Sequence, residues 1–298
     1  MATSNSTFEA KIVVPTLAFM RLQTIKALGL PMTYKDKSTL NEHLDVLATT
    51  LPASDIYPVA QYMCIGDKGH YMADELGDGE YVPMPVRHSP TDVAPYRIRP
   101  LVLRRIDNDL SDSERAKYAL RKLTEIGGVK YWAYYLIRLS MTGVSVNDYK
   151  VTVEDGVRTT EAFTYTDSEL YPTQPEMPDY DYDFTDQTVT SDGKYVSSSA
   201  AVSLMLDAAA LEEYLNVCKI IKGSAAKSVI SEVCLVTGVD TTATGESYTG
   251  APFTYNEVTG AQIAVFMTTF NMASMANDSI KFTMTIGQTA PMPVRVSG

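Results

Sequence analysis

The stretch VTVEDGV, residues 151–157, contains the strongest secondary-structure signal in the chain. Apolar and polar residues alternate from Val151 to Glu154, which is the period of a β-strand with one buried face. Asp155 and Gly156 are residue types that adopt the two positive φ angles of a tight type I′ turn, and Val157 begins a second run. We therefore predict a β-hairpin here and antiparallel strands as the main elements of the fold.

Further strands are predicted on both sides of this hairpin, in runs rich in β-branched and aromatic residues. These runs cover residues 57–65, 101–106, 195–206, 229–236, 262–270 and 280–286. Helices are predicted over 38–50 and 208–221, the second with Asp207 as its N-cap and Gly223 as its stop. The predicted fold class is α+β, with mostly antiparallel, sandwich-like sheets, a few inserted helices and an extended acidic arm.

The segment that follows residue 110 allows two structures. Ser111 and Glu114 form the pattern of a capping box, which predicts a helix over about residues 112–123. The runs 120–126 and 129–139 flank Gly127 and Gly128 in the manner of a β-hairpin, which competes for the same residues. The end of this helix therefore stays open.

Shifts in composition predict the domain organisation. Residues 1–56 form an N-terminal arm and helix, and residues 57–165 form a β-rich domain with a helix and a long Pro- and Gly-rich loop over 66–100. Residues 166–192 contain acids, Pro and Tyr but no Lys or Arg, which is typical of a linker or extended arm. Residues 193–298 form a C-terminal α+β part, which can pack with 57–165 as one domain.

The charge balance and the cysteines limit the classes of function. The formal net charge of −11 argues against binding to nucleic acid or to an anionic membrane, because phosphate groups need clustered Lys and Arg. No run approaches the roughly 18 apolar residues of a transmembrane helix. Cys64, Cys218 and Cys234 form no CxxC motif and lie in apolar runs, so we expect buried free thiols.

The sequence contains no motif for catalysis or cofactor binding. It has no GxxxxGK[ST] phosphate loop, no GxSxG nucleophile elbow and no HExxH zinc motif. His43 is expected on the surface of a helix. His70 and His88 share a loop region with Asp67, and hydrogen bonding to the loop is favoured over a metal site because the spacing matches no known cage. We therefore predict no enzyme activity, no cofactor and no metal.

An acidic and a basic segment are predicted to form interfaces. In DYDYDF, acids and aromatic residues alternate, so an extended backbone places them on opposite faces. These residues are Asp179, Tyr180, Asp181, Tyr182, Asp183 and Phe184. Docking on a neighbour is favoured, and calcium binding by the carboxylates is the alternative. Arg104 and Arg105 belong to a basic stretch, residues 97–122, for which the hypothesis is that it receives the acidic segment of another copy. The alternatives are an ordinary solvated face and, disfavoured by the net charge, a contact with nucleic acid.

Four phrases carry a resemblance to a known group of proteins. They are YMCIGDKGHYM (62–72), PVRHSPTDVAPYRIRPLVLRRIDNDLSDSERAKYALRK (85–122), YWAYYLIRL (131–139) and VISEVCLVTGVD (229–240). Together they resemble an uncharacterised family of virion structural proteins from tailed bacteriophages with contractile tails. The resemblance spans residues 55–285 and brings no catalytic residues.

This resemblance implies a structural protein of the tail or baseplate, located in the virion after assembly in the host cytoplasm. Its expected partners are other virion structural proteins and further copies of itself as a homo-oligomer. The 19 Tyr and 14 Met residues agree with this expectation, since both types are common at interfaces. The alternatives are a neck or head–tail connector, a tail-associated hydrolase using His70, Asp74 and Glu75, and a receptor-binding protein with Tyr-rich loops.

Overall fold

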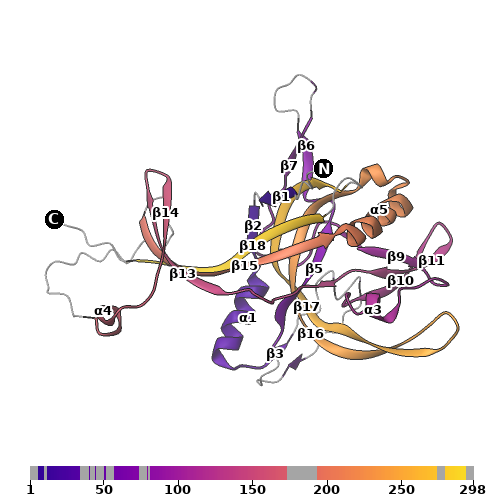
Figure 1. Cartoon of the computed structure of the whole chain (residues 1–298), viewed down its shortest axis with the longest axis horizontal. Coiled ribbons are helices and arrows are strands. Elements are labelled where there is room, and N and C mark those ends of the chain that lie inside the picture. Colours follow the sequence, from indigo (N-terminus) through magenta and orange to yellow (C-terminus); the bar gives the residue numbers. More distant parts are fainter. Residues whose placement is uncertain are drawn as a thin grey trace. The chain divides into compact units, whose positions relative to one another are not determined.

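The structure is a computed structural model that describes residues 6–9, 12–33, 40, 44, 50–51, 57–73, 79, 81–172, 193–273 and 279–292. Antiparallel strands dominate and helices are few, which confirms the predicted fold class (Figure 1). The strands are β1 (Ser6–Glu9), β2 (Ile12–Pro15), β3 (Met32–Thr33), β4 (Thr50–Leu51), β5 (Val59–Gly66), β6 (His70–Ala73), β7 (Val82–Pro85), β8 (Ile98–Arg99), β9 (Val102–Arg105), β10 (Arg121–Ile126), β11 (Val129–Tyr134), β12 (Ile137–Arg138), β13 (Val146–Glu154), β14 (Val157–Ala162), β15 (Gly193–Asp207), β16 (Val229–Glu246), β17 (Pro252–Met272) and β18 (Ser279–Pro291). The helices are α1 (Leu17–Leu28), α3 (Asp112–Arg115), α4 (Asp167–Leu170), α5 (Ala208–Lys222) and the 3-10 turn η1 (Ala225–Lys227).

The chain divides into two compact units. Unit 1 comprises Met1–Ser140 and Ser203–Thr283, and unit 2 comprises Met141–Val202 and Met284–Gly298. These boundaries differ from those expected from composition, at residues 57, 166 and 193. The physical reason is that β15 and β18 each run through both units as continuous strands, so no change of composition marks the passage from one unit to the other.

The main sheet of unit 1 has the order β12-β5-β16-β17-β2, with β8 also paired to β5. All pairs within it are antiparallel. Its central strands read as near-continuous apolar runs because both faces are covered. Tyr62, Cys64, Val236 and Phe266 belong to one core cluster, while Met63, on the opposite face of β5 from Cys64, is also fully buried. Burial of side chains of this size is the main source of the unit's stability.

The predicted buried thiols are confirmed. Cys64 and Cys234 are register partners on β5 and β16, Cys218 lies on α5, and all three are buried and free. Burial raises the pKa of the Cys234 thiol, and hydrogen bonding and charge interaction with the adjacent Cys64 raise it further. The same burial raises the pKa of Cys218. The protonated, weakly nucleophilic form of these two thiols is therefore favoured.

The helix predicted over 208–221 is confirmed as α5. The Asp207 side chain accepts a hydrogen bond from the amide of Ala210, and Gly223 ends the helix with a φ of 75°. Leu211, Tyr214 and Cys218 recur at helical spacing and are buried. α5 therefore presents one apolar face to the core of unit 1.

The region after residue 110 resolves in favour of the hairpin. The capping box is present, since Ser111 accepts from the Glu114 amide and Glu114 accepts from the Ser111 amide. The prediction that this helix reaches residue 123 was wrong, because α3 is a single turn, Asp112–Arg115. The β10–β11 hairpin takes the residues from 121 onward, because Gly127 and Gly128 adopt φ angles of 59° and 78° and the strands pair with each other and with β9.

The N-terminal segment contains a helix that the sequence analysis described only as an arm or short elements. Thr16 caps α1 by accepting from the Phe19 amide, and Gly29 ends it with a φ of 63°. Leu22 and Ile25 are its buried residues and pack in a small cluster with Met32. The other apolar residues of α1 are distributed around the helix axis. The sequence therefore lacks the polar stripe that normally indicates a surface helix.

Unit 2 contains the hairpin predicted from residues 151–157. Asp155 has a φ of 50° and Gly156 a φ of 74°, which confirms the positive angles expected of the turn. β13 pairs antiparallel with β14 on one side and with β15 on the other, and β18 continues the order beyond β15. β14 is the terminal strand of this sheet.

Several predictions fall on residues outside the described ranges. These are the helix over 38–50, His43, most of the acidic arm from residue 173 onward, and the DYDYDF stretch at 179–184. Leu40 and Leu44, which are described, are buried in the main core cluster.

Candidate functional site

A buried carboxylate lies under the loop that follows β7. Glu232, on β16, is 0% exposed. Its two oxygens accept hydrogen bonds from the backbone amides of Lys68 (3.2 Å), Tyr96 (2.6 Å) and Arg97 (3.4 Å). The Nε2 atom of His88 lies 3.1 Å from the same carboxylate. Glu232 therefore connects the central sheet to two separate loop segments.

The His88 ring is enclosed on every side by protein groups. It stacks between Tyr96 and Phe266, with centroid distances of 4.2 and 3.9 Å. Its Nδ1 atom lies 2.8 Å from the Asp92 carboxylate, opposite the contact of Nε2 with Glu232. Both ring nitrogens therefore lie within hydrogen-bond distance of a carboxylate oxygen. This histidine fixes the loop rather than facing solvent.

A second buried carboxylate, Asp67, joins the same loop to α5. The Asp67 oxygens lie 2.6 Å from Arg97 Nε, 2.9 Å from Arg99 Nε and 2.6 Å from Lys222 Nζ. Burial by itself raises the pKa of Asp67, but hydrogen bonds from Arg97 and Lys222 and the charge of Arg99 outweigh it and hold the pKa below its ordinary value of 3.8. We call the set Asp67, His88, Asp92, Arg97, Arg99, Lys222 and Glu232 the loop anchor.

The loop anchor contains two of the residues considered in the sequence for metal binding, His88 and Asp67. His88 and Asp67 are fully engaged within it, whereas His70 lies against Phe270 with a centroid distance of 4.8 Å. Burial lowers the pKa of His70. Asp74, Glu75 and Asp78 lie outside the described residues. Within the described ranges, no three His, Cys, Asp or Glu side chains are grouped as a metal site requires. The anchor has the properties of a structural clamp.

Glu232 is the residue that the sequence analysis missed here. It occupies the fourth position of VISEVCLV, where every other residue but one is apolar. A lone acid inside a buried strand is costly unless partners surround it, so this position is itself a signal for a buried polar cluster.

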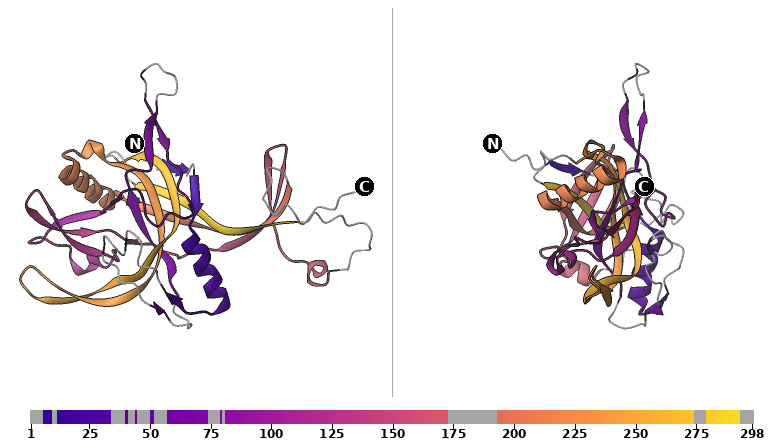
Figure 2. Two further views of the ribbon diagram at one scale, coloured as in Figure 1. Left: turned by 180° about the vertical axis from the view of Figure 1, so that it is seen from behind. Right: turned by 90° about the vertical axis from the view of Figure 1, so that its right-hand side faces the viewer.

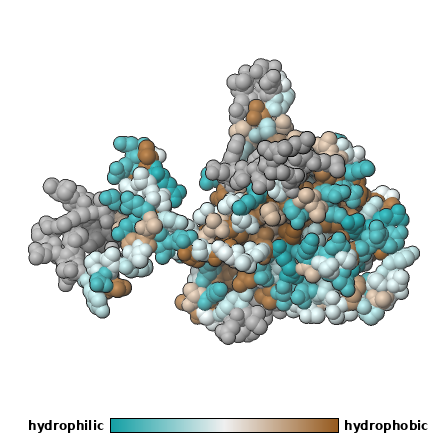
Figure 3. All heavy atoms as spheres, in the orientation of Figure 1, coloured by the Kyte–Doolittle hydropathy of each residue, from teal (hydrophilic) through white to brown (hydrophobic). Residues whose placement is uncertain are grey.

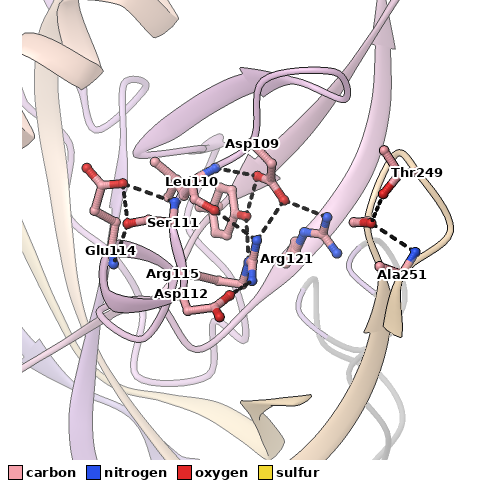
Figure 4. Close-up of polar contacts among 11 residues, drawn as sticks. Asp109, Leu110, Ser111, Asp112, Glu114, Arg115, Arg121, Thr249 and Ala251 are labelled. Carbon is pink, nitrogen blue, oxygen red and sulfur yellow. Dashed lines mark hydrogen bonds and ion pairs between the residues drawn. The ribbon is translucent and has the colours of Figure 1, made fainter. Parts of the chain in front are cut away.

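A second network surrounds Asp109 (Figure 4). The Asp109 carboxylate accepts from Arg121 Nη2 at 2.7 Å, from Arg115 Nη2 at 3.2 Å and from the Tyr134 hydroxyl at 2.6 Å. Burial and the hydrogen bond to Asp109 raise the pKa of Tyr134 to about 12. The guanidinium of Arg115 lies 3.9 Å from the centre of the Phe253 ring, near the distal end of the β16–β17 hairpin. This network therefore ties that hairpin to α3 and to the β10–β11 hairpin.

The turn of the β16–β17 hairpin has its own polar closure, which Figure 4 also shows. The Ser247 hydroxyl accepts a hydrogen bond from the Ala251 amide at 3.0 Å and lies 2.9 Å from the hydroxyl of Thr249. These contacts organise the turn locally.

The predicted interface arginines have different environments. Arg104 is paired with Glu213, which lines a cavity of about 140 Å³ together with Tyr118 and Met205. Burial raises the pKa of Glu213. Arg105 is 63% exposed in its side chain and pairs with Asp107 at 3.2 Å. Most arginines of the basic stretch form ion pairs within the chain. Arg105 is the more exposed of the two predicted interface arginines.

The sheet of unit 2 has little core of its own. Among the described residues of this unit, the buried apolar side chains are Val151, Val202 and Met284, and the last two adjoin the unit boundaries. One face of the sheet carries Val151 next to its register partner Tyr195. No helix longer than the single turn α4 covers either face within the described part of unit 2.

Large apolar side chains of unit 2 are exposed instead. Val146 is 70% exposed, Val157 65% and Tyr171 82%. Val146 and Val157 lie at opposite ends of one face of the sheet, because Val157 is the register partner of Glu154. Between them the same face carries the polar residues Asp148, Lys150 and Thr152 of β13. Among the described residues of unit 2, few apolar side chains therefore contribute to a core.

Comparisons with known proteins place the chain in a family. Within the described residues, no helix combines the length and apolar character that crossing a membrane requires. No curated protein and no solved structure matches the chain. A family model with the description "Family of unknown function (DUF7208)" matches residues 1–297. The chain therefore belongs to this family of unknown function, DUF7208.

Proposed function

We propose that the chain is a structural subunit that acts by burying its surfaces against neighbouring subunits, in the tail or baseplate of a tailed-phage virion. The observation that carries the assembly part of this proposal is the sheet of unit 2. The described residues of unit 2 provide a single buried apolar side chain away from the unit boundaries, Val151, while Val146 and Val157 of the sheet and Tyr171, after α4, are exposed. A neighbouring subunit would supply the missing layer.

The polar networks of unit 1 agree with a structural role. The polar side-chain atoms of Glu232, His88 and Asp67 are engaged by other groups of the same chain. A catalytic cleft instead needs a titratable group directed at open space where a reacting atom can sit. The anchor holds long loops in a fixed form, and a fixed surface is what repeated contacts between identical subunits require.

The phage part of the proposal rests on the resemblance of residues 55–285 to tailed-phage virion proteins. Such a subunit needs no cofactor. Its partners would be further copies of itself and other virion proteins, and its location would be the virion.

The proposal is tested by replacing an exposed valine of the unit 2 sheet with a charged residue. Val157→Lys places an ammonium group at a 65% exposed position, where little cost to folding is expected. We expect the variant to keep the wild-type circular dichroism spectrum and melting temperature, while its mass by light scattering at a given concentration falls toward that of a monomer. Val93→Lys, at a 51% exposed position of unit 1, is the matched control and should assemble as the wild type does. Equal assembly of both variants and the wild type would refute the role of this face.

A further inference from the structure

The cavity beside Glu213 has a role in neither of the two polar networks described above. It has a volume of about 140 Å³ and lies between the start of α5, β9 and the segment around α3. Figures 1 and 2 show α5, in orange, alongside β9, and the two elements pack against each other. All of its lining residues belong to unit 1. Two of them, Met205 and Glu212, are exposed, so a ligand can enter from solvent.

The wall of this cavity carries an excess of negative charge. Four carboxylates line it, against the single ammonium group of Lys117. Arg104, which pairs with Glu213, offsets one further negative charge. The four acids are Glu114, Asp207, Glu212 and Glu213. Because negative charge remains after both cations are counted, the wall favours a positively charged occupant.

A buried hydroxyl group at this wall has no partner. Tyr118 is 7% exposed and lines the cavity, and its hydroxyl forms no hydrogen bond with any described residue. Burial raises the pKa of Tyr118, and the negative charges of Glu213, Asp207 and Glu114 raise it further. The hydroxyl therefore lies near the carboxylates of the cavity wall. Buried polar groups are nearly always hydrogen-bonded, so this oxygen is a free acceptor for a ligand.

Glu213 provides a second free acceptor at the same wall. Arg104 contacts its Oε1 atom through a single nitrogen, Nη2. The Oε2 atom is buried and has no hydrogen-bond partner among the described residues. A buried carboxylate oxygen without a donor is costly, so a ligand that donates a hydrogen bond here is bound favourably.

The remaining wall is largely apolar, and this limits the class of cation. Val102, Leu110 and Ile137 are among its lining residues. Within the described ranges, no three carboxylates converge as a metal ion requires. A cavity of about 150 Å³ can hold a molecule the size of benzene, with about six heavy atoms. A butylammonium group, with about five heavy atoms, is of similar size and combines an apolar stem with a compact head that carries three donors.

We propose that this cavity binds a primary alkylammonium group. The ammonium head donates hydrogen bonds to Glu213 Oε2 and to the Tyr118 hydroxyl, while the alkyl stem packs against the apolar wall. In Figure 3, hydrophilic residues, in teal, predominate over the part of unit 1 that carries α5, so a solvated cation approaches across a polar surface. A free amine and a lysine side chain of another polypeptide both carry this group. Binding does not depend on the assembly function, because one copy contains the whole cavity.

A titration of the full chain with butylammonium chloride tests the site. Saturation-transfer NMR at neutral pH and constant ionic strength measures the Kd. We expect saturable binding that is about tenfold tighter than that of butan-1-ol, which has the same stem without the charge. Binding of butan-1-ol as tight as that of butylammonium would overturn the proposal, and so would the absence of saturable binding.

Three variants locate the binding. Tyr118→Phe removes only the hydroxyl and keeps the ring that packs against Tyr134, so we expect a wild-type melting temperature and about fivefold weaker binding. Glu213→Gln should weaken binding about tenfold, because the ammonium loses its charged acceptor. Glu125→Gln removes an exposed carboxylate of β10 outside the cavity and should bind as the wild type does. Equal affinity in Tyr118→Phe and Glu125→Gln overturns the proposal, even if Glu213→Gln fails to fold.

A second titration distinguishes the two sources of the group. Nα-acetyl-lysine N-methylamide presents the same head and stem on a peptide backbone. Its binding as tightly as butylammonium supports the site and identifies a lysine side chain as an occupant that the cavity accepts. Binding of butylammonium alone supports the site for free amines.

Discussion

Glu232 lies in the middle of an otherwise apolar strand, and its surroundings determine whether a charge is tolerated there. Three backbone amides and one imidazole face its two oxygens, so the buried charge is compensated by donors from two loop segments. Hydrogen bonds to a buried charge are individually stronger than those between neutral groups. Their number explains why a strand of the central sheet can hold an acid.

The first prediction concerns this side chain. Glu232→Ala leaves His88 and the Tyr96 amide without their acceptor, so we expect the free energy of unfolding to fall by about 4 kcal/mol. Urea denaturation measures it. Glu125→Ala, which removes an exposed carboxylate from β10, is the control and should change stability by less than about 0.5 kcal/mol. A loss at Glu232 as small as that of the control would show that the anchor does not stabilise the fold.

The second prediction concerns the pH dependence of Asp67. Its pKa is lowered in the folded protein by Arg97, Lys222 and Arg99, despite the opposing effect of burial. A depressed folded pKa gives stability that is present above the unfolded value of 3.8 and is lost as the pH falls through the folded pKa. We therefore expect the urea midpoint of the wild type to drop as the pH is lowered from about 5 to about 3.

Asp67→Asn isolates this contribution, because asparagine does not titrate in that range. The variant should be less stable than the wild type at neutral pH, and the difference between them should shrink in acid. Parallel curves for the two proteins would contradict the assignment of the acid sensitivity to Asp67.

Individual residues could be predicted from the sequence where their signal is local. The Ser111–Glu114 capping box, the Asp207 and Gly223 caps and the Asp155-Gly156 turn all depend on neighbours in the chain, and the structure confirms them. The partners of Glu232 and Asp67 could not be predicted, because Asp67 and Lys222 are distant in sequence and meet only through the fold.

At the scale of elements, competition between local and long-range structure accounts for the errors. The capping box starts a helix at residue 112, but β10 offers pairing with β11 and the two glycines that make a tight turn possible. Pairing with β9 and β11 then outweighs the local preference for continuing the helix. The helix α1 was not predicted for a different reason, because its apolar residues lie on more than one side of the helix. The signals that could have predicted it are Thr16 as the N-cap and Gly29 as the stop.

The third prediction concerns the distal part of the β16–β17 hairpin. Phe253 receives the guanidinium of Arg115 at 3.9 Å and lies 5.0 Å from that of Arg121. Phe253→Ala removes both contacts, each of about 1 kcal/mol, so the amides of residues 240–246 should exchange hydrogen faster while those of residues 230–236 keep their protection. Hydrogen–deuterium exchange measured by mass spectrometry reports both segments.

Thr254→Ala is the matched control, because Thr254 is exposed and adjacent to Phe253 on the same strand. Equal exchange in the two variants would mean that the cation–π contacts do not hold the hairpin in place.

At the scale of the whole molecule, the fold class followed from the alternation of apolar residues, but the division into units did not. Composition placed a boundary at residue 166, where acids and prolines begin, whereas the structure separates residues 141–202 from what precedes and follows them. Because β15 and β18 each belong to both units, their sequences show continuous strands with no break. The interface residues predicted at 179–184 lie outside the described ranges, and their role stays a prediction.

Exposed apolar surface is the property of the whole molecule that most needs an explanation. The sheet of unit 2, the paired strands β6 and β7, and the helix α1 each expose large apolar side chains. Single exposed apolar residues are ordinary on a monomer, but several that share a face or an element indicate sites of association. Assembly into a larger structure would remove all three surfaces from water.

The central claim, that this chain works by associating with copies of itself, is tested most directly by its mass in solution. Multi-angle light scattering on the purified full chain, over a series of concentrations, compares the particle mass with the 32.7 kDa of one chain. The account predicts a mass of several chains, which decreases toward one chain on dilution or when Val157→Lys is introduced. A mass of one chain at every concentration would contradict it.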